Sequence, residues 1–159
     1  MLVDSLRRLD WYIGIPLCAL LSVLRRLYSL VSPKPITPTP HKVLIIKLSE
    51  MGSSVLAYPA LAELKTRCPD IQLYFLVFAK NVAILEALKL APAEHFVTID
   101  YRTPWQLLRS GLAAIRQLLR ERFDTAIDMD FFSRMTALIS FLVCRGNRVG
   151  FYQYNDEGL

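Results

Sequence analysis

The feature that most constrains the fold is an alternation, from Lys42 onward, of short apolar runs with longer segments of helical periodicity. Continuous β-branched runs are typical of strands that are buried on both faces. The expected strands are 43–46, 71–78, 96–99, 125–129 and 148–151, and the expected helices are 55–68, 81–90, 105–123 and 134–143. Strands that alternate with helices pair in parallel through crossover connections. The sequence therefore predicts a doubly wound, mainly parallel α/β sheet.

A different composition precedes this pattern. An apolar run from Trp11 to Leu24 lies between two arginine pairs, Arg7-Arg8 and Arg25-Arg26. The run is shorter than the roughly 20 residues that a spanning helix needs, and Pro16 interrupts it. We expect residues 1–31 to form a membrane-associating helical segment that lies in one leaflet, with the arginines of residues 7–31 on anionic headgroups. A helix packed on the protein's own core and a genuine span remain open alternatives.

The segment 32–41 is rich in proline and reads as a semi-rigid linker. It separates the N-terminal segment from a domain at 42–159. With 159 residues, 53% of them hydrophobic, the chain can form one domain with a real core. Its net charge of +5 is spread out and no nucleic-acid motif is present, so we expect no nucleic-acid partner. Three widely spaced cysteines and two histidines indicate no metal site.

Two loops are expected to meet in this domain. Ligands of doubly wound sheets bind beyond the carboxyl ends of the strands, where the strand order reverses, and the first and fourth strands usually flank that point. The loops that follow those two strands are 49–54 and 130–134. The sequence therefore predicts one binding site built from both.

The first loop, SEMGSS, follows Lys47. It is neither a Walker A loop nor a G-x-G-x-x-G fingerprint. A tight turn at Gly52, with Ser53 and Ser54 near a helix N-terminus, would place backbone N–H groups where they favour an anion or a hydroxyl. An ordinary strand-to-helix turn would have the same appearance.

The second loop follows IDMD and ends at Arg134. We expect one of Asp128 and Asp130 to have a structural role and the other to project into the crevice, where a carboxylate can take a proton from a sugar hydroxyl. Arg134 can clamp a phosphate.

The long helix expected at 105–123 carries two stripes. Leu108, Leu112, Ile115 and Leu119 share one face, as in an amphipathic helix, and Arg109, Arg116 and Arg120 lie about a quarter-turn away. A solvated face is the ordinary interpretation of the arginines, and contact with an anionic membrane is the alternative.

Together these motifs resemble glycosyltransferase family nine, the lipopolysaccharide heptosyltransferases. The resemblance rests on Lys47, Ser49, Gly52 and Pro59-Ala60-Leu61 in the first unit. Phe123-Asp124, Ile127-Asp128, Arg134 and Arg148-Val149-Gly150-Phe151 follow in the same order. It covers roughly residues 42–151. It implies a Rossmann-like N-terminal, acceptor-binding half of a GT-B fold. It also implies metal-independent, inverting transfer from a nucleotide-sugar such as ADP-heptose, with no further cofactor.

Two departures from the family pattern matter. The family's usual base is an Asp after the glycine, and Ser53 stands at that position. The resemblance therefore leaves Asp130, which we favour, or Glu50 as the base, or an altered activity. The chain also ends just past the expected fifth strand, so we expect a fragment whose donor-binding C-terminal half is absent.

We therefore expect a glycosyltransferase that acts at the cytoplasmic face of the bacterial inner membrane on a lipopolysaccharide, other glycolipid or polysaccharide acceptor. Lys47, Ser49, Gly52, Ser53, Ser54 and Arg134 are the expected acceptor- and phosphate-binding residues. This half alone should not catalyse transfer, because donor and acceptor must be held in one site. The alternative is a non-catalytic, membrane-attached module that binds a glycan or a partner protein.

Overall fold

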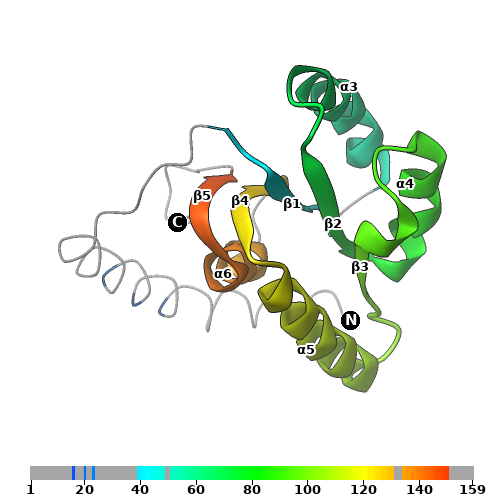
Figure 1. Cartoon of the computed structure of the whole chain (residues 1–159). Coiled ribbons are helices and arrows are strands. Elements are labelled where there is room, and N and C mark those ends of the chain that lie inside the picture. The colour runs from blue at the N-terminus through cyan, green and yellow to red at the C-terminus, as the bar shows by residue number, and fades with distance from the viewer. Residues whose placement is uncertain are drawn as a thin grey trace.

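The computed structural model describes residues 39–48, 51–130 and 134–150, together with Pro16, Leu20 and Val23. Its centre is a five-stranded sheet of order β3-β2-β1-β4-β5 (Figure 1). The strands are β1 (Lys42–Ile46), β2 (Gln72–Phe78), β3 (Phe96–Ile99), β4 (Phe123–Asp128) and β5 (Cys144–Gly150). Every neighbouring pair is parallel. The predicted doubly wound α/β fold is confirmed, and the strand order reverses between β1 and β4.

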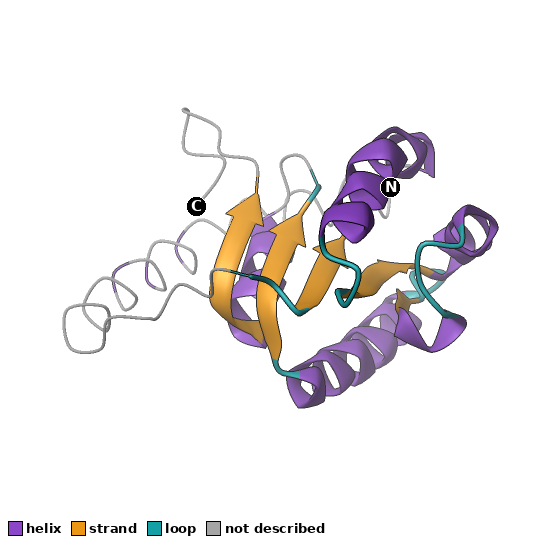
Figure 2. Cartoon of the chain, turned by 45° about the horizontal axis from the view of Figure 1, so that its top comes forward, coloured by secondary structure: helices purple, strands orange, loops and turns teal. Residues whose placement is uncertain are grey.

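Helices cover both faces of the sheet (Figure 2). They are α3 (Met51–Arg67), α4 (Val82–Leu88), α5 (Pro104–Glu121) and α6 (Arg134–Val143), with short 3-10 turns at Ala79–Asn81 and Ala93–His95. Successive side chains of β1 point to opposite faces. Leu44 and Ile46 join the core beneath α5 and α6, whereas Val43 and Ile45 join the core beneath α3 and α4. Burial on both faces explains why β1 is apolar from Val43 to Ile46.

Asp124 ties the amino end of β1 to β4. One oxygen of its carboxylate accepts hydrogen bonds from the backbone N–H groups of His41, at 2.8 Å, and Lys42, at 2.9 Å. The Phe-Asp pair that contributes to the family resemblance therefore has a structural function here. It fixes where β1 starts relative to β4, and so where the two strands end at the opposite edge of the sheet.

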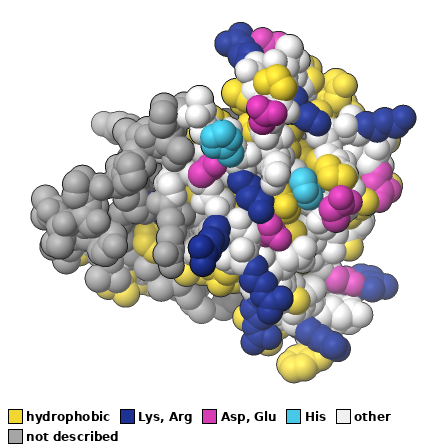
Figure 3. Space-filling model, in the orientation of Figure 1, with side chains coloured by type: hydrophobic (Ala, Val, Ile, Leu, Met, Phe, Trp, Pro, Cys, Tyr) yellow, Lys and Arg dark blue, Asp and Glu magenta, His cyan; other side chains and the backbone are white. Residues whose placement is uncertain are grey.

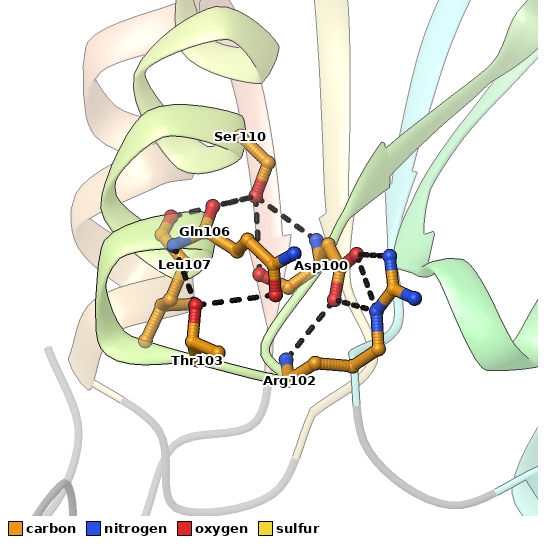
Figure 4. A network of polar contacts seen from close by, with 6 residues as sticks. All are labelled: Asp100, Arg102, Thr103, Gln106, Leu107 and Ser110. Carbon is orange, nitrogen blue, oxygen red and sulfur yellow. Dashed lines mark hydrogen bonds and ion pairs between the residues drawn. The ribbon is translucent and has the colours of Figure 1, made fainter.

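A capping network fixes the start of α5 (Figure 4). The Thr103 hydroxyl accepts a hydrogen bond from the backbone N–H of Gln106 at 3.2 Å, and Pro104 takes the first helical position. The Ser110 hydroxyl accepts from the backbone N–H of Asp100 at 2.9 Å, which ties the helix to the end of β3. The Arg102 guanidinium, which hydrogen bonds to Asp100, lowers the pKa of that carboxyl.

Two predicted element boundaries are wrong. Helix α3 begins at Met51 rather than Val55, so Gly52 lies inside the helix and not in a tight turn; no glycine of the described residues has a positive φ. Strand β5 begins at Cys144, four residues before the predicted start at Arg148. Its early residues pair with β4 across a register shift, where a Cβ on Gly146 would lie 1.9 Å from the Asp124 carbonyl oxygen. Only glycine fits that approach.

The leucine stripe of α5 is not the face that packs on the sheet. Ala114 and Leu118 are buried there, whereas Leu108, Leu112 and Leu119 are about half exposed. Among the described residues, no helix combines the length and apolar character needed to cross a bilayer. Apart from three residues, the predicted membrane-associating segment lies outside the described residues, as does most of the predicted linker. Pro16, Leu20 and Val23 are helical and exposed.

Candidate acceptor site at the sheet reversal

Strands β1 and β4 end together at the point where the strand order reverses. Ile46 pairs with Asp128, and the backbone N–H of Met129 donates to the Ile46 carbonyl oxygen at 2.9 Å. The chain leaves this edge toward α3 on one side and toward α6 on the other. The two loops that the sequence predicts to converge do leave neighbouring strand ends.

A buried ion pair joins the two strand ends. Lys47 Nζ lies 2.9 Å from Asp130 Oδ1 and donates to the Met129 carbonyl oxygen at 3.1 Å. The other carboxylate oxygen of Asp130 accepts the backbone N–H of Leu48 at 2.7 Å. Both side chains are almost fully buried, with exposed fractions of 5% for Lys47 and 3% for Asp130. Removing either partner would leave an uncompensated buried charge, so this pair locks the two strand ends together.

Asp130 is therefore the structural carboxylate of the two. The sequence interpretation favours Asp130 as the group that projects into the crevice, but both of its oxygens are hydrogen bonded inside the protein. A carboxylate held by an ammonium group and an N–H cannot reach an acceptor hydroxyl in this arrangement. Its observed action is to orient Lys47 and the backbone of Leu48.

Asp128 is the carboxylate whose pKa is shifted. Burial raises its pKa from 3.8 to about 6, opposed by hydrogen bonds from the Thr136 hydroxyl and the Asp130 backbone N–H, the latter at 3.1 Å. Gly150 pairs with Asp128 across the sheet, and a Cβ there would lie 3.3 Å from the Asp128 Cβ. The absent side chain leaves room for this buried carboxyl. Sequence reasoning named Asp128 and included Gly150 only as part of the Arg-Val-Gly-Phe motif. It missed Thr136, for which the sequence offers no local signal.

The amino end of α3 forms the other side of the site. Gly52 is exposed, and a Cβ added to it would meet nothing within 4 Å. No acidic residue occupies the first turn of α3, where the helix start carries a partial positive charge. Ser53 and Ser54 belong to that turn, but their side chains, like Ser49 and Glu50, lie outside the described part.

Arg134 begins α6 at the same edge and is buried, with 7% of its surface exposed. Lys47, which is paired with Asp130, and Arg134 are two buried cationic groups at this edge of the sheet. Within the described ranges, no group of three or more His, Cys, Asp or Glu residues is arranged to hold a metal ion.

This combination defines a class of fold: a parallel α/β sheet of order 3-2-1-4-5 whose binding edge lies at the β1/β4 reversal. Solved glycosyltransferases share the fold. The Escherichia coli heptosyltransferase WaaC, in its structures with ADP-2-deoxy-2-fluoro heptose and with ADP, superposes with TM-scores of 0.58 and 0.57 at 22% and 21% identity. The glycosyl transferase family 9 protein from Veillonella parvula has a TM-score of 0.57 at 12% identity.

These matches cover 69%, 69% and 72% of the chain but only 36%, 35% and 36% of the solved structures. The chain therefore spans about a third of their length. No protein-family model matches the sequence, and no curated protein matches it. The expected structural resemblance to the heptosyltransferases is confirmed, and at these identities the resemblance establishes the fold.

Proposed function

We propose that this chain is the acceptor-side half of a heptosyltransferase-type glycosyltransferase, which transfers a sugar from a nucleotide-sugar to lipopolysaccharide or another lipid-linked glycan. The observation that carries the proposal is the superposition of the parallel 3-2-1-4-5 sheet on solved heptosyltransferase structures, with TM-scores of 0.58 and 0.57. The solved neighbours from Escherichia coli contain ADP and an ADP-heptose analogue, which makes ADP-heptose the leading donor. The transfer is proposed to be inverting and metal-independent, with the donor held mainly by a second half.

In this proposal the start of α3 binds an anionic or hydroxyl group of the acceptor. The exposed Gly52 lets a ligand approach the helix backbone, and the N–H groups of the first turn, including those of Ser53 and Ser54, face it. Lys47 and Arg134 supply positive charge beneath that position, and Ser49 completes the loop. A phosphorylated sugar of a glycolipid core has the chemistry that this rim favours.

The base is the part of the site that the geometry reassigns. Asp130 is occupied by Lys47 and Leu48, so we propose that it positions Lys47 rather than accepting the proton. Glu50, the other candidate, lies beyond the described residues, in the segment between β1 and α3. We propose Glu50 as the general base of the complete enzyme.

We further propose that residues 7–31 hold the protein on the cytoplasmic face of the bacterial inner membrane. Their apolar run and flanking arginine pairs have the chemistry of an interfacial anchor. This location would bring the acceptor site to a lipid-linked substrate.

A second candidate function is a non-catalytic, membrane-attached module that binds a glycan or partner. Two observations favour it. Ser53 stands where the resemblance places the base, and the Asp130 carboxylate is held in an internal ion pair with Lys47. Such a module would bind acceptor at the same rim without transferring sugar.

The test is a transfer assay on the complete product of the reading frame. It is incubated with labelled nucleotide-sugars, ADP-heptose among them, and with lipopolysaccharide core acceptors of increasing length. We expect transfer from one donor, loss of turnover in Glu50→Gln, and retained but weakened turnover in Asp130→Asn. Acceptor binding without transfer from any donor would select the module instead, and absence of both would overturn the proposal.

A further inference from the structure

Helix α5 presents an apolar stripe to solvent. The exposed fractions are 71% for Trp105, 54% for Leu108, 49% for Leu112 and 49% for Leu119. At about 100° per residue these four positions fall on one face, adjacent to the face that packs on the sheet. Scattered exposed leucines are ordinary, but a contiguous set on one helix marks an interaction surface. At 1.5 Å per residue the stripe runs for about 21 Å.

A row of positive charge borders the stripe. Arg109, Arg116 and Arg120 are all exposed and lie about a quarter-turn from the leucines. The only acidic residue of α5 is Glu121, which is paired with Lys42 at the end of the helix. The row therefore has no acidic residue of its own helix to neutralise it. Figure 3 shows Lys and Arg side chains gathered at the part of the surface that α5 occupies in Figure 1.

The helix is held firmly enough to act as one surface. The Thr103 cap fixes the first turn, and the Ser110 contact with Asp100 ties the second turn to the end of β3 (Figure 4). Ala114 and Leu118 anchor the neighbouring face of the helix in the core. Trp105 consequently projects from a fixed position, at the edge of the sheet where the strands end.

We propose that α5 is a membrane-docking helix that lies in the plane of an anionic bilayer surface. The leucines enter the boundary between headgroups and acyl chains, Trp105 lies at headgroup level, and the arginine row contacts lipid phosphates. Charge selects this occupant, because a purely apolar partner would leave the arginines beside the stripe without counter-charge, whereas an anionic lipid surface satisfies both. This contact goes beyond the proposed function, since it requires neither sugar transfer nor residues 7–31.

Trp105 can report on this contact directly. The chain has two tryptophans, so Trp11→Phe in the full chain leaves Trp105 as the sole emitter. Vesicles of phosphatidylglycerol and phosphatidylcholine, with brominated acyl chains, should shift its emission to the blue and quench it. Pure phosphatidylcholine vesicles should do so much more weakly. Because residues 7–31 are themselves proposed to bind membranes, quenching of Trp105 is the readout, rather than sedimentation with the vesicles.

Matched variants separate the contribution of the arginine charges from that of the apolar stripe. In the Trp11→Phe background, Arg116→Gln should raise the lipid concentration for half-maximal quenching roughly fivefold, since one arginine near an anionic surface has about that effect. Arg67→Gln removes the same charge from an exposed arginine of α3 and should change the midpoint by less than about twofold. Leu112→Gln should weaken quenching, whereas Leu56→Gln, at an exposed leucine of α3, should not. Far-ultraviolet circular dichroism confirms that each variant is folded.

Three outcomes would overturn the proposal. The first is a Trp105 that stays accessible to an aqueous quencher while the protein sediments with vesicles, which would leave the N-terminal anchor standing alone. The second is equal quenching by neutral and anionic vesicles with no effect of Arg116→Gln. The third is a Trp105 that is already shielded from the aqueous quencher in the absence of lipid. Shielding that is independent of protein concentration would mean that residues 1–31 cover the stripe, and shielding that depends on protein concentration would mean that a second copy of the chain covers it.

Discussion

Replacement of Asp128 by asparagine should stabilise the protein at neutral pH. The folded state raises the pKa of this carboxyl from 3.8 to about 6, because burial disfavours its charged form. The hydrogen bonds from the Thr136 hydroxyl and the Asp130 backbone N–H do not fully compensate, and the neighbouring charges of Asp130 and Lys47 act in opposite directions. Asparagine has the same shape, keeps an acceptor oxygen for the Asp130 N–H and carries no charge.

The sign of the effect follows from proton linkage. Between pH 4 and pH 6 the folded state holds a proton on Asp128 that the unfolded state has released, so stability from this group falls as pH rises through that window. A shift of about two pKa units corresponds to about 3 kcal/mol. Asp128→Asn should thus be nearly neutral below pH 4 and should gain up to about 3 kcal/mol above pH 7.

Urea unfolding at several pH values between roughly 3.5 and 7.5, a range that spans both pKa values, measures this difference directly. Thr136→Val is the matched variant, since it removes the hydroxyl that hydrogen bonds to the charged form and should raise the pKa of Asp128 further. A constant difference between Asp128→Asn and the parent protein across the pH range would refute the reasoning. So would a destabilisation that grows with pH, because it would mean that the folded state favours the carboxylate.

Three further predictions concern the same architecture. Gly146→Ala should destabilise the protein by roughly 3 kcal/mol or more, because the added Cβ would overlap a backbone oxygen. Gly111→Ala, in α5 with open space around it, is the control and should be neutral or stabilising by up to about 1 kcal/mol. Thermal unfolding compares the two variants. Lys47→Met should cost about 3–5 kcal/mol by leaving Asp130 buried and unpaired, and Lys47→Met with Asp130→Leu should recover much of that loss in urea unfolding. Gly52→Ala should leave stability unchanged or slightly raised, yet weaken binding of a phosphorylated glycan in calorimetry; unchanged affinity would show that no ligand approaches there.

The alternation of apolar runs and helical segments was enough to predict the sheet, since parallel strands buried on both faces admit few other residue patterns. All five strands are present, and the reversal lies between β1 and β4 as expected. The start of β5 was missed because Cys144-Arg145-Gly146-Asn147 has little strand character of its own. Pairing with β4 and the close approach at Gly146 hold it in the sheet.

The errors at the site have a different origin. Serine and glycine have low helix propensity, so the sequence predicts a loop where the structure has the first turn of α3. The Lys47–Asp130 pair joins residues 83 positions apart, and nothing local in the sequence indicates which of two carboxylates a lysine will take. Likewise the leucine stripe of α5 has the correct period for a buried face, but the small residue Ala114 and Leu118 give the closer fit to the sheet. The local sequence pattern determines the helices and strands, whereas burial and pairing in the folded protein determine which side chains remain available to bind a ligand.

The most direct test of the central claim is a residue-by-residue binding map. The isotope-labelled full chain is titrated with a phosphorylated lipopolysaccharide core oligosaccharide, and backbone amide shifts are followed by nuclear magnetic resonance. The account predicts saturable shifts that centre on Leu48, Gly52 and Met129, at the carboxyl edge of β1 and β4. Shifts confined to the opposite edge, around Lys89 and Phe96, or no saturable shifts at all, would contradict it.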